Sequence, residues 1–165
     1  MFILLRQLAT IRRSAGLTRG GSRWLAIRHV DAGSCNGCEH ELGAVTNPLH
    51  DLQRHGLDIV ASPRHADILL ITGPVTTRMA GPLRTAYEAM PQPRLVAALG
   101  DCALGLNLLG DEAELVGAVE DVLPVDIRIP GCPPTPDAIA EHILAAIERG
   151  RPPSSLRTDS GNHRD

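Results

Sequence analysis

The feature that most constrains this chain is the distribution of its four cysteines. Two of them form a C-x2-C pair, Cys35 and Cys38, and the other two, Cys102 and Cys132, are isolated. A C-x2-C pair brings two thiolates close enough to share one metal centre, and two further cysteines complete a four-thiolate shell. Such a shell suits a single zinc ion or a single iron–sulfur cluster. The fold must therefore bring together loops that are distant in sequence.

The residues alone leave three interpretations of these cysteines open. Structural zinc sites usually consist of two local pairs with a short gap, whereas here one pair and two single cysteines are widely separated. A thioredoxin-like redox pair would give Cys102 and Cys132 no role. Each cysteine has a glycine nearby, which lets the backbone approach a bulky cofactor. These glycines are Gly33, Gly37, Gly100 and Gly131. We therefore favour an iron–sulfur cluster over zinc, with unrelated cysteines as the third alternative.

The composition predicts one domain with an aliphatic core. The chain has 165 residues, and only 2% of them are aromatic. The net charge of −3 is too small to imply a nucleic-acid partner. Four cysteines without a signal-peptide pattern fit a reducing compartment better than a disulfide framework. The apolar stretches are too short for a membrane span, so we expect a protein that is soluble or peripheral to a membrane.

The two ends of the chain differ from its middle. Residues 1–23 are basic, with apolar residues at roughly helical spacing, and no acidic residue precedes Asp31. This pattern predicts an amphipathic arm that docks on an anionic membrane surface or a partner subunit. A frayed arm or a transit peptide would have a similar composition. We expect residues 24–150 to form the cluster-binding α/β domain and residues 151–165 to form a disordered polar tail.

Between the two ends, apolar runs alternate with helical patterns. Strands are expected at residues 24–30, 57–61, 66–73, 94–99 and 125–129. Helices are expected at residues 39–52, with a break or restart at Asn47-Pro48, and at residues 82–90, 111–123 and 136–149. This alternation predicts a mostly parallel sheet with right-handed crossovers, and such sheets bind ligands beyond the carboxyl ends of their strands. All three cysteine loops follow expected strands, so we expect them to meet at one edge of the sheet.

Several segments resemble a known family. They are Asp31–Glu39, Ser62–Leu70, Gly100–Cys102 and Val125–Pro134. These segments look like the small electron-transfer subunit shared by complex I and the group 4 membrane-bound nickel–iron hydrogenases. In complex I this is the 20 kDa, or B, subunit, and formate hydrogenlyase has an equivalent hydrogenase subunit. The resemblance covers about residues 24–148. Complex I members usually carry adjacent cysteines at the first site, so the C-x2-C pair is more similar to the hydrogenase branch.

The resemblance implies one 4Fe–4S cluster held by Cys35, Cys38, Cys102 and Cys132. It also implies a large partner subunit, of the hydrogenase or complex I 49 kDa type, and membrane-arm subunits that pump ions. We expect a flavodoxin-like three-layer α/β fold with a mostly parallel sheet. The chain is expected to relay single electrons as one subunit of a larger oxidoreductase, without catalytic residues of its own, at the cytoplasmic side of the cell membrane. The alternative is a zinc- or cluster-stabilised scaffold subunit without a redox role.

Four further residues lie in or beside the segments that resemble the family. Glu39 matches an acid that lies at the large-subunit interface of hydrogenase-type relatives, where it could relay protons; it could equally be a first-turn helix acid. Arg64 and His65 match the family's loop and are expected to meet the partner subunit or the cluster surroundings, or else to be solvated. Asp101 replaces the small polar residue common in complex I, and a buried charge there would lower the reduction potential of a cluster.

Overall fold

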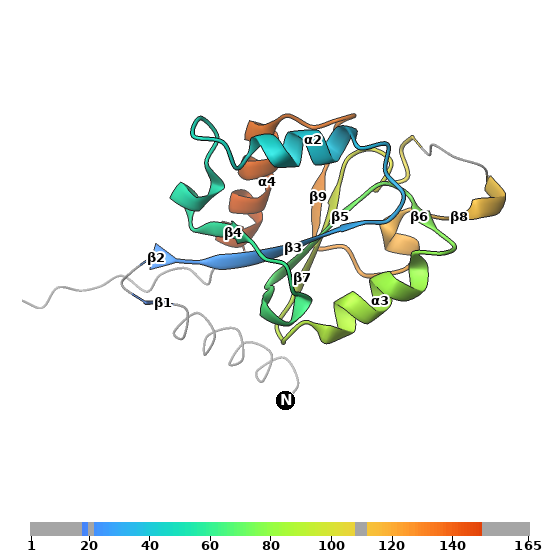
Figure 1. Ribbon diagram of the computed structural model, residues 1–165, viewed down its shortest axis with the longest axis horizontal. Coiled ribbons are helices and arrows are strands. Elements are labelled where there is room, and N and C mark those ends of the chain that lie inside the picture. Colours follow the sequence, from blue (N-terminus) through green and yellow to red (C-terminus); the bar gives the residue numbers. More distant parts are fainter. Residues whose placement is uncertain (1–17, 20–21, 108–111, 150–165) are drawn as a thin grey trace, which may run out of the picture.

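The computed structural model of the 165-residue chain describes residues 18–19, 22–107 and 112–149. Its centre is a five-stranded parallel sheet with the strand order β4-β3-β5-β7-β9 (Figure 1). The strands are β3 (Leu25–Asp31), β4 (Leu57–Ile59), β5 (Ile68–Thr72), β7 (Leu95–Leu99) and β9 (Ile127–Ile129). When these five strands are numbered by their position along the chain, their order across the sheet is 2-1-3-4-5, which is the flavodoxin-like order. The predicted fold class is confirmed.

Helices cover both faces of the sheet, which gives three layers. The helices are α2 (Gly37–Ala44), α3 (Ala80–Ala89) and α4 (Pro136–Arg149). Figure 1 shows α2 and α4 on one face and α3 on the other. In β5, Ile68 and Leu70 belong to the apolar cluster on the face of α2 and α4, whereas Leu69 and Ile71 belong to the cluster on the face of α3. All four side chains are fully buried, as expected for a central parallel strand.

The remaining elements are short. Four are 3₁₀ helices: η1 (Leu52–His55), η2 (Pro63–His65), η3 (Glu112–Glu114) and η4 (Val119–Asp121). Two antiparallel pairs stand apart from the main sheet: β1 (Thr18–Arg19) with β2 (Ser22–Arg23), and β6 (Val75–Thr76) with β8 (Leu115–Gly117). The helix expected over residues 39–52 is interrupted, as predicted, and α2 ends at Ala44. The Asn47 side chain accepts hydrogen bonds from the backbone N–H groups of Leu49 and His50 and forms a turn.

The helix predicted over residues 111–123 is wrong. The described part of this segment forms η3, β8 and η4 instead of one α-helix. Gly117 has a φ of 134°, which no α-helix accommodates, and β8 pairs with β6. The apolar residues of the segment recur at helical spacing, but Val116 is exposed whereas Val119 is fully buried. Backbone pairing and one glycine conformation therefore override the periodicity.

The register of the sheet places the ends of its central strands side by side. Asp31 pairs with Thr72, Thr72 with Leu99, and Leu99 with Ile129. Since the strands are parallel, the loops that follow β3, β5, β7 and β9 all emerge at the same edge. The sheet thereby positions a site built from loops that are distant in sequence.

Parts of the predicted domain organisation concern residues outside the described ranges. Of the expected amphipathic arm, residues 1–23, the structure describes β1 and β2 alone. The rest of the arm and the expected polar tail, residues 151–165, lie outside the described residues. None of the described helices is long and apolar enough to cross a lipid bilayer.

Candidate metal centre

The four cysteines lie in the loops that leave the carboxyl edge of the sheet. Cys35 and Cys38 follow β3, Cys102 follows β7, and Cys132 follows β9. Cys35 and Cys132 are exposed, whereas Cys38 and Cys102 are partly buried, and no disulfide bond joins any of them. The sheet therefore brings the predicted ligand residues to one edge.

The first loop presents its two cysteines through a tight turn and a helix start. The Asp31 carboxylate accepts hydrogen bonds from the backbone N–H groups of Gly33 (2.9 Å) and Ser34 (2.8 Å). Asn36, between the two cysteines, has a left-handed φ of 67° and precedes α2. Cys38 is the second residue of α2, where the helix dipole favours a negative thiolate.

The three cysteine loops touch one another. A Cβ atom on Gly100 would lie 2.6 Å from Cys38 Sγ, and the φ of Gly100 is 94°. A Cβ atom on Gly37 would lie 3.5 Å from Cys35 Sγ and 3.9 Å from Cβ of Pro133. The first loop thus contacts both the loop of Cys102 and the loop of Cys132. Glycine is needed at position 100 because the backbone passes directly against a cysteine sulfur.

Asp101 joins the second and third cysteine loops. Its backbone N–H donates to the carbonyl oxygen of Gly131 at 2.9 Å, and its carboxylate accepts from the N–H of Gly131 at 2.7 Å. The N–H of Gly100 also donates to the carbonyl oxygen of Ile129. Asp101 therefore fixes the separation of Cys102 and Cys132. The sequence shows the charge of Asp101 but not this bridging role, which requires knowing which loops are neighbours.

The pKa of Cys38 reflects its burial and the charges around it. The pKa of Cys38 is raised to about 12, first by burial, then by Glu39, and then by each of the other three cysteines. All three therefore lie near enough to act on its charge. In the described residues, no group of three or more His, Cys, Asp or Glu side chains is arranged to hold a single metal ion.

Glu39 belongs to a small polar cluster between α2 and the sheet. Its Oε1 accepts a hydrogen bond from Thr72 Oγ1 and lies 3.6 Å from His29 Nε2. Thr72 Oγ1 lies 2.9 Å from the same nitrogen. Burial lowers the pKa of His29, although the carboxylates of Glu39 and Asp31 act in the opposite direction. The sequence-based prediction missed His29 and Thr72. The available signal was Thr72 at the end of an otherwise apolar buried strand, whereas His29 lies in a strand with other polar residues.

Arg64 and His65 are not part of this constellation. Both are exposed and lie in η2, which precedes β5 and so stands at the amino edge of the sheet. The cysteine loops leave the opposite edge. The two residues are therefore remote from the cysteines, because they precede a strand whereas every cysteine follows one.

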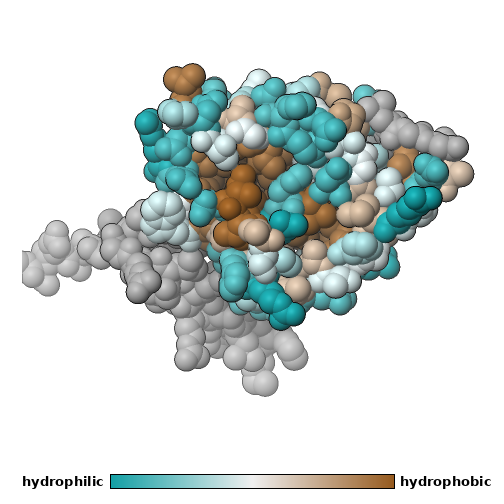
Figure 2. Space-filling model, viewed as in Figure 1, coloured by the Kyte–Doolittle hydropathy of each residue, from teal (hydrophilic) through white to brown (hydrophobic). Residues whose placement is uncertain are grey.

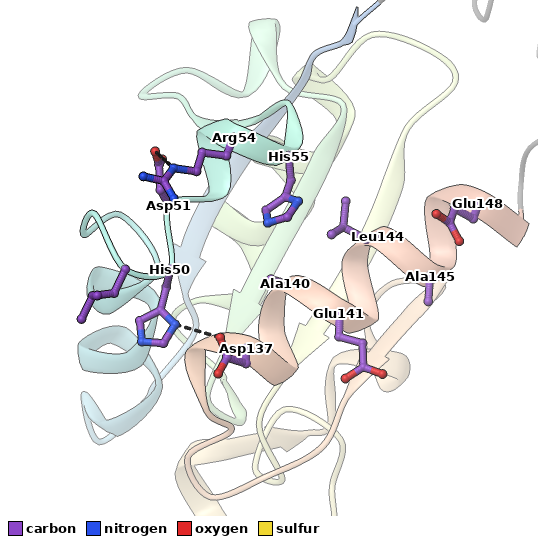
Figure 3. Close-up of a pocket in the computed structure, with 11 residues that line it drawn as sticks. His50, Asp51, Arg54, His55, Asp137, Ala140, Glu141, Leu144, Ala145 and Glu148 are labelled. Atoms are coloured by element: carbon purple, nitrogen blue, oxygen red, sulfur yellow. Dashed lines mark hydrogen bonds and ion pairs between the residues drawn. The ribbon is translucent and has the colours of Figure 1, made fainter.

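A groove of about 620 Å³ lies on another part of the surface, between η1 and α4 (Figure 3). Its walls include Ala140 and Leu144 of α4, and His50 Nδ1 is 2.8 Å from Asp137 Oδ1 at one end. No cysteine lines this groove. Figure 2 shows apolar surface amid polar residues over the part of the molecule that carries α4. The groove is thus distinct from the cysteine edge.

The chain is similar to subunits of several oxidoreductases. A family model described as NADH ubiquinone oxidoreductase, 20 Kd subunit, matches residues 35–146. The probable membrane-bound hydrogenase subunit mbhJ of Pyrococcus furiosus is 42% identical over 130 residues, which span 79% of this chain and 77% of that protein. A subunit of the NADH-quinone oxidoreductase of Nocardioides sp. is 36% identical, over 95% of this chain and 80% of that protein.

Two further similarities extend this result. Formate hydrogenlyase subunit 7 of Escherichia coli is 43% identical over 133 residues. The matched region covers 81% of this chain but only 52% of that longer protein. Among solved structures, a chain of the archaeal membrane-bound sulfane sulfur reductase, a respiratory membrane complex, superposes with a TM-score of 0.69 at 29% identity. That superposition covers 86% of this chain and 75% of the other.

Proposed function

The chain belongs to the family of the 20 kDa subunit of NADH ubiquinone oxidoreductase, and from this premise we propose that it is the electron-transfer subunit of a membrane-associated oxidoreductase complex. We propose further that it carries one 4Fe–4S cluster on Cys35, Cys38, Cys102 and Cys132. The observation that supports this most directly is the contact among the three cysteine loops, where Gly100 lies against Cys38 Sγ, Gly37 lies near Pro133, and Asp101 bonds Gly131. The family resemblance noted in the sequence is confirmed.

The residues at this edge fit such a cluster. Four thiolates are the usual ligand set of a 4Fe–4S cluster, which when bound takes up and releases one electron at a time. Gly100 keeps the space beside the Cys38 sulfur free of a side chain. Asp101 holds the two single-cysteine loops at a fixed separation. Burial raises the pKa of the Cys38 thiol, and binding of a cluster would release its proton, because the thiolate is the form that binds metal.

We propose that the catalytic step takes place on a large partner subunit of the hydrogenase or complex I 49 kDa type. Cys35 and Cys132 are exposed, so a partner that covers this edge would exclude water from the cluster. Peripheral attachment to membrane-arm subunits, at the cytoplasmic side, belongs to the same proposal. The basic arm, residues 1–23, stays a predicted contact with the membrane or a partner.

Iron and sulfide analysis tests the cluster. Protein prepared without oxygen, together with its partner, should contain about four irons and four acid-labile sulfides per chain. Cys102→Ser or Cys132→Ser should remove most of both, because the cluster joins loops that the remaining ligands cannot hold alone. His40→Gln is the matched control, since His40 is an exposed residue of α2 near Cys38.

The outcome of that analysis separates the two candidate functions. One zinc per chain without acid-labile sulfide would contradict the cluster and support the scaffold alternative. A cluster that no reductant reduces would also favour a scaffold. Full iron content in both serine variants would show that these cysteines are not ligands.

A further inference from the structure

A chain of three side chains connects β3, β5 and α2. His29 Nε2 is 2.9 Å from Thr72 Oγ1, and Thr72 Oγ1 donates to Glu39 Oε1. Thr72 is fully buried, while the side chains of His29 and Glu39 are 22% and 20% exposed. The three residues come from separate elements of the fold, so the connection depends on the register of β3 with β5.

The direction of the hydrogen bonds follows from the proton count. A threonine hydroxyl has one proton, and here it points to the carboxylate of Glu39. The hydroxyl oxygen can then only accept, so His29 donates through its Nε2–H. Burial lowers the pKa of His29, which favours the neutral ring. His29 therefore supplies a hydrogen bond without a positive charge that would neutralise Glu39.

The other oxygen of Glu39 is buried and has no hydrogen-bond partner among the described residues. Glu39 directly follows Cys38 in α2. Its partner Thr72 pairs with Leu99, the residue before Gly100, and a Cβ atom on Gly100 would lie 2.6 Å from Cys38 Sγ. The carboxylate is thus held through Oε1, and its Oε2 is not screened by a donor. A fixed negative charge beside a cluster ligand disfavours the addition of an electron.

We propose that His29 and Thr72 are positioning residues that hold the Glu39 carboxylate beside Cys38 and thereby lower the reduction potential of the cluster. The inference rests on the proposed function, because it requires a redox-active cluster. Neither residue touches the cysteines in the contacts described above; both act through Glu39.

A redox titration followed by electron paramagnetic resonance tests this proposal on the anaerobically purified complex. Glu39→Gln should favour reduction about tenfold, which is about 59 mV for one electron. Thr72→Val should shift the potential in the same direction by a smaller amount, because the freed carboxylate turns towards solvent. Thr72→Ser, which keeps the hydroxyl, should restore the wild-type potential. His29→Leu should resemble Thr72→Val.

Glu41→Gln is the matched control, since Glu41 lies on the same helix but Thr72 donates to Glu39. In a Glu39→Gln background, Thr72→Val should have no further effect on the potential. An unchanged or lower potential in Thr72→Val, with full iron content, would overturn the positioning role. A wild-type protein without a reducible cluster would instead refute the proposed function, so the two failures are distinguishable.

Discussion

At the scale of single residues, the site depends on positions where the backbone itself lies against a cysteine. Gly100 is buried, has a positive φ and leaves no room for a methyl group beside Cys38. Gly131, on the neighbouring loop, also has a positive φ and packs against Pro134. Such positions tolerate glycine alone without strain.

Gly100→Ala should lower both cluster content and stability. The alanine Cβ would lie 2.6 Å from Cys38 Sγ, and the left-handed backbone costs about 1–3 kcal/mol for a residue other than glycine. Iron per chain and the midpoint temperature of unfolding measure the two effects. Gly81→Ala in α3 is the control, because nothing lies within 4 Å of its Cβ position, and it should be neutral or slightly stabilising. Equal iron content in the two variants would contradict the prediction.

His29 predicts a dependence of stability on pH. Its pKa is lowered in the folded chain, chiefly by burial, so the unfolded chain binds a proton first as the pH falls below about 6.5. This contribution to stability is complete above that pH and declines below it. The midpoint temperature should therefore fall less steeply between pH 7 and 5 in His29→Gln than in the wild type. The exposed His40→Gln serves as control, and identical slopes in all three proteins would refute the assignment.

At the scale of elements, the sequence predicts strands better than connections. The run at residues 66–73 predicts a strand with apolar side chains on both faces. This pattern is typical of a strand buried in the middle of a parallel sheet, as β5 is. The helical spacing over residues 111–123 fails because Gly117 and the pairing with β6 are decided by tertiary contacts. The cysteines could be assigned to one edge because each cysteine loop follows an expected strand. The Asp101 bridge and the His29–Thr72 contact could not be predicted, because they depend on which loops and side chains become neighbours in the fold.

The start of α4 offers a test of local structure. Thr135 Oγ1 accepts from the N–H of Ala138 at 3.3 Å, and Pro136 is the first helical residue, as the sequence predicts. Thr135→Ala should cost about 1 kcal/mol and lower the midpoint temperature by about 3 °C. The control is Thr85→Ala, since Thr85 is also exposed but only donates to Gly81 within α3. A loss as large at Thr85 would show that the cap has no special role.

At the scale of the whole molecule, the carboxyl edge of the sheet carries the features of an interaction surface. The carboxyl edge has the exposed Cys35 and Cys132 together with Leu106, which is 70% exposed. The N–H of Leu106 donates to the carbonyl oxygen of Asp101, which keeps it in the loop of Cys102. An exposed leucine beside exposed cysteines is the expected composition of a surface that a partner covers.

Leu106→Glu should therefore weaken association with the large subunit. A charge in the centre of an apolar contact loses burial and remains desolvated, so the effect should be at least tenfold in the dissociation constant, or about 1.4 kcal/mol. Leu49→Glu is the control, because Leu49 is even more exposed but lines the groove beside α4. Co-purification and size-exclusion chromatography provide the measurement. Equal weakening by both variants would refute the placement of the interface.

For the proposed cluster, the division of the four cysteines among three loops also determines when it can be inserted. A ribosome releases Cys35 and Cys38 long before Cys132, which follows β9, the last strand of the sheet. Two thiolates on a nascent chain cannot complete a four-thiolate shell, so loading follows synthesis of the whole sheet. A cellular carrier that delivers the proposed cluster would consequently have to recognise a folded surface, not a linear cysteine motif.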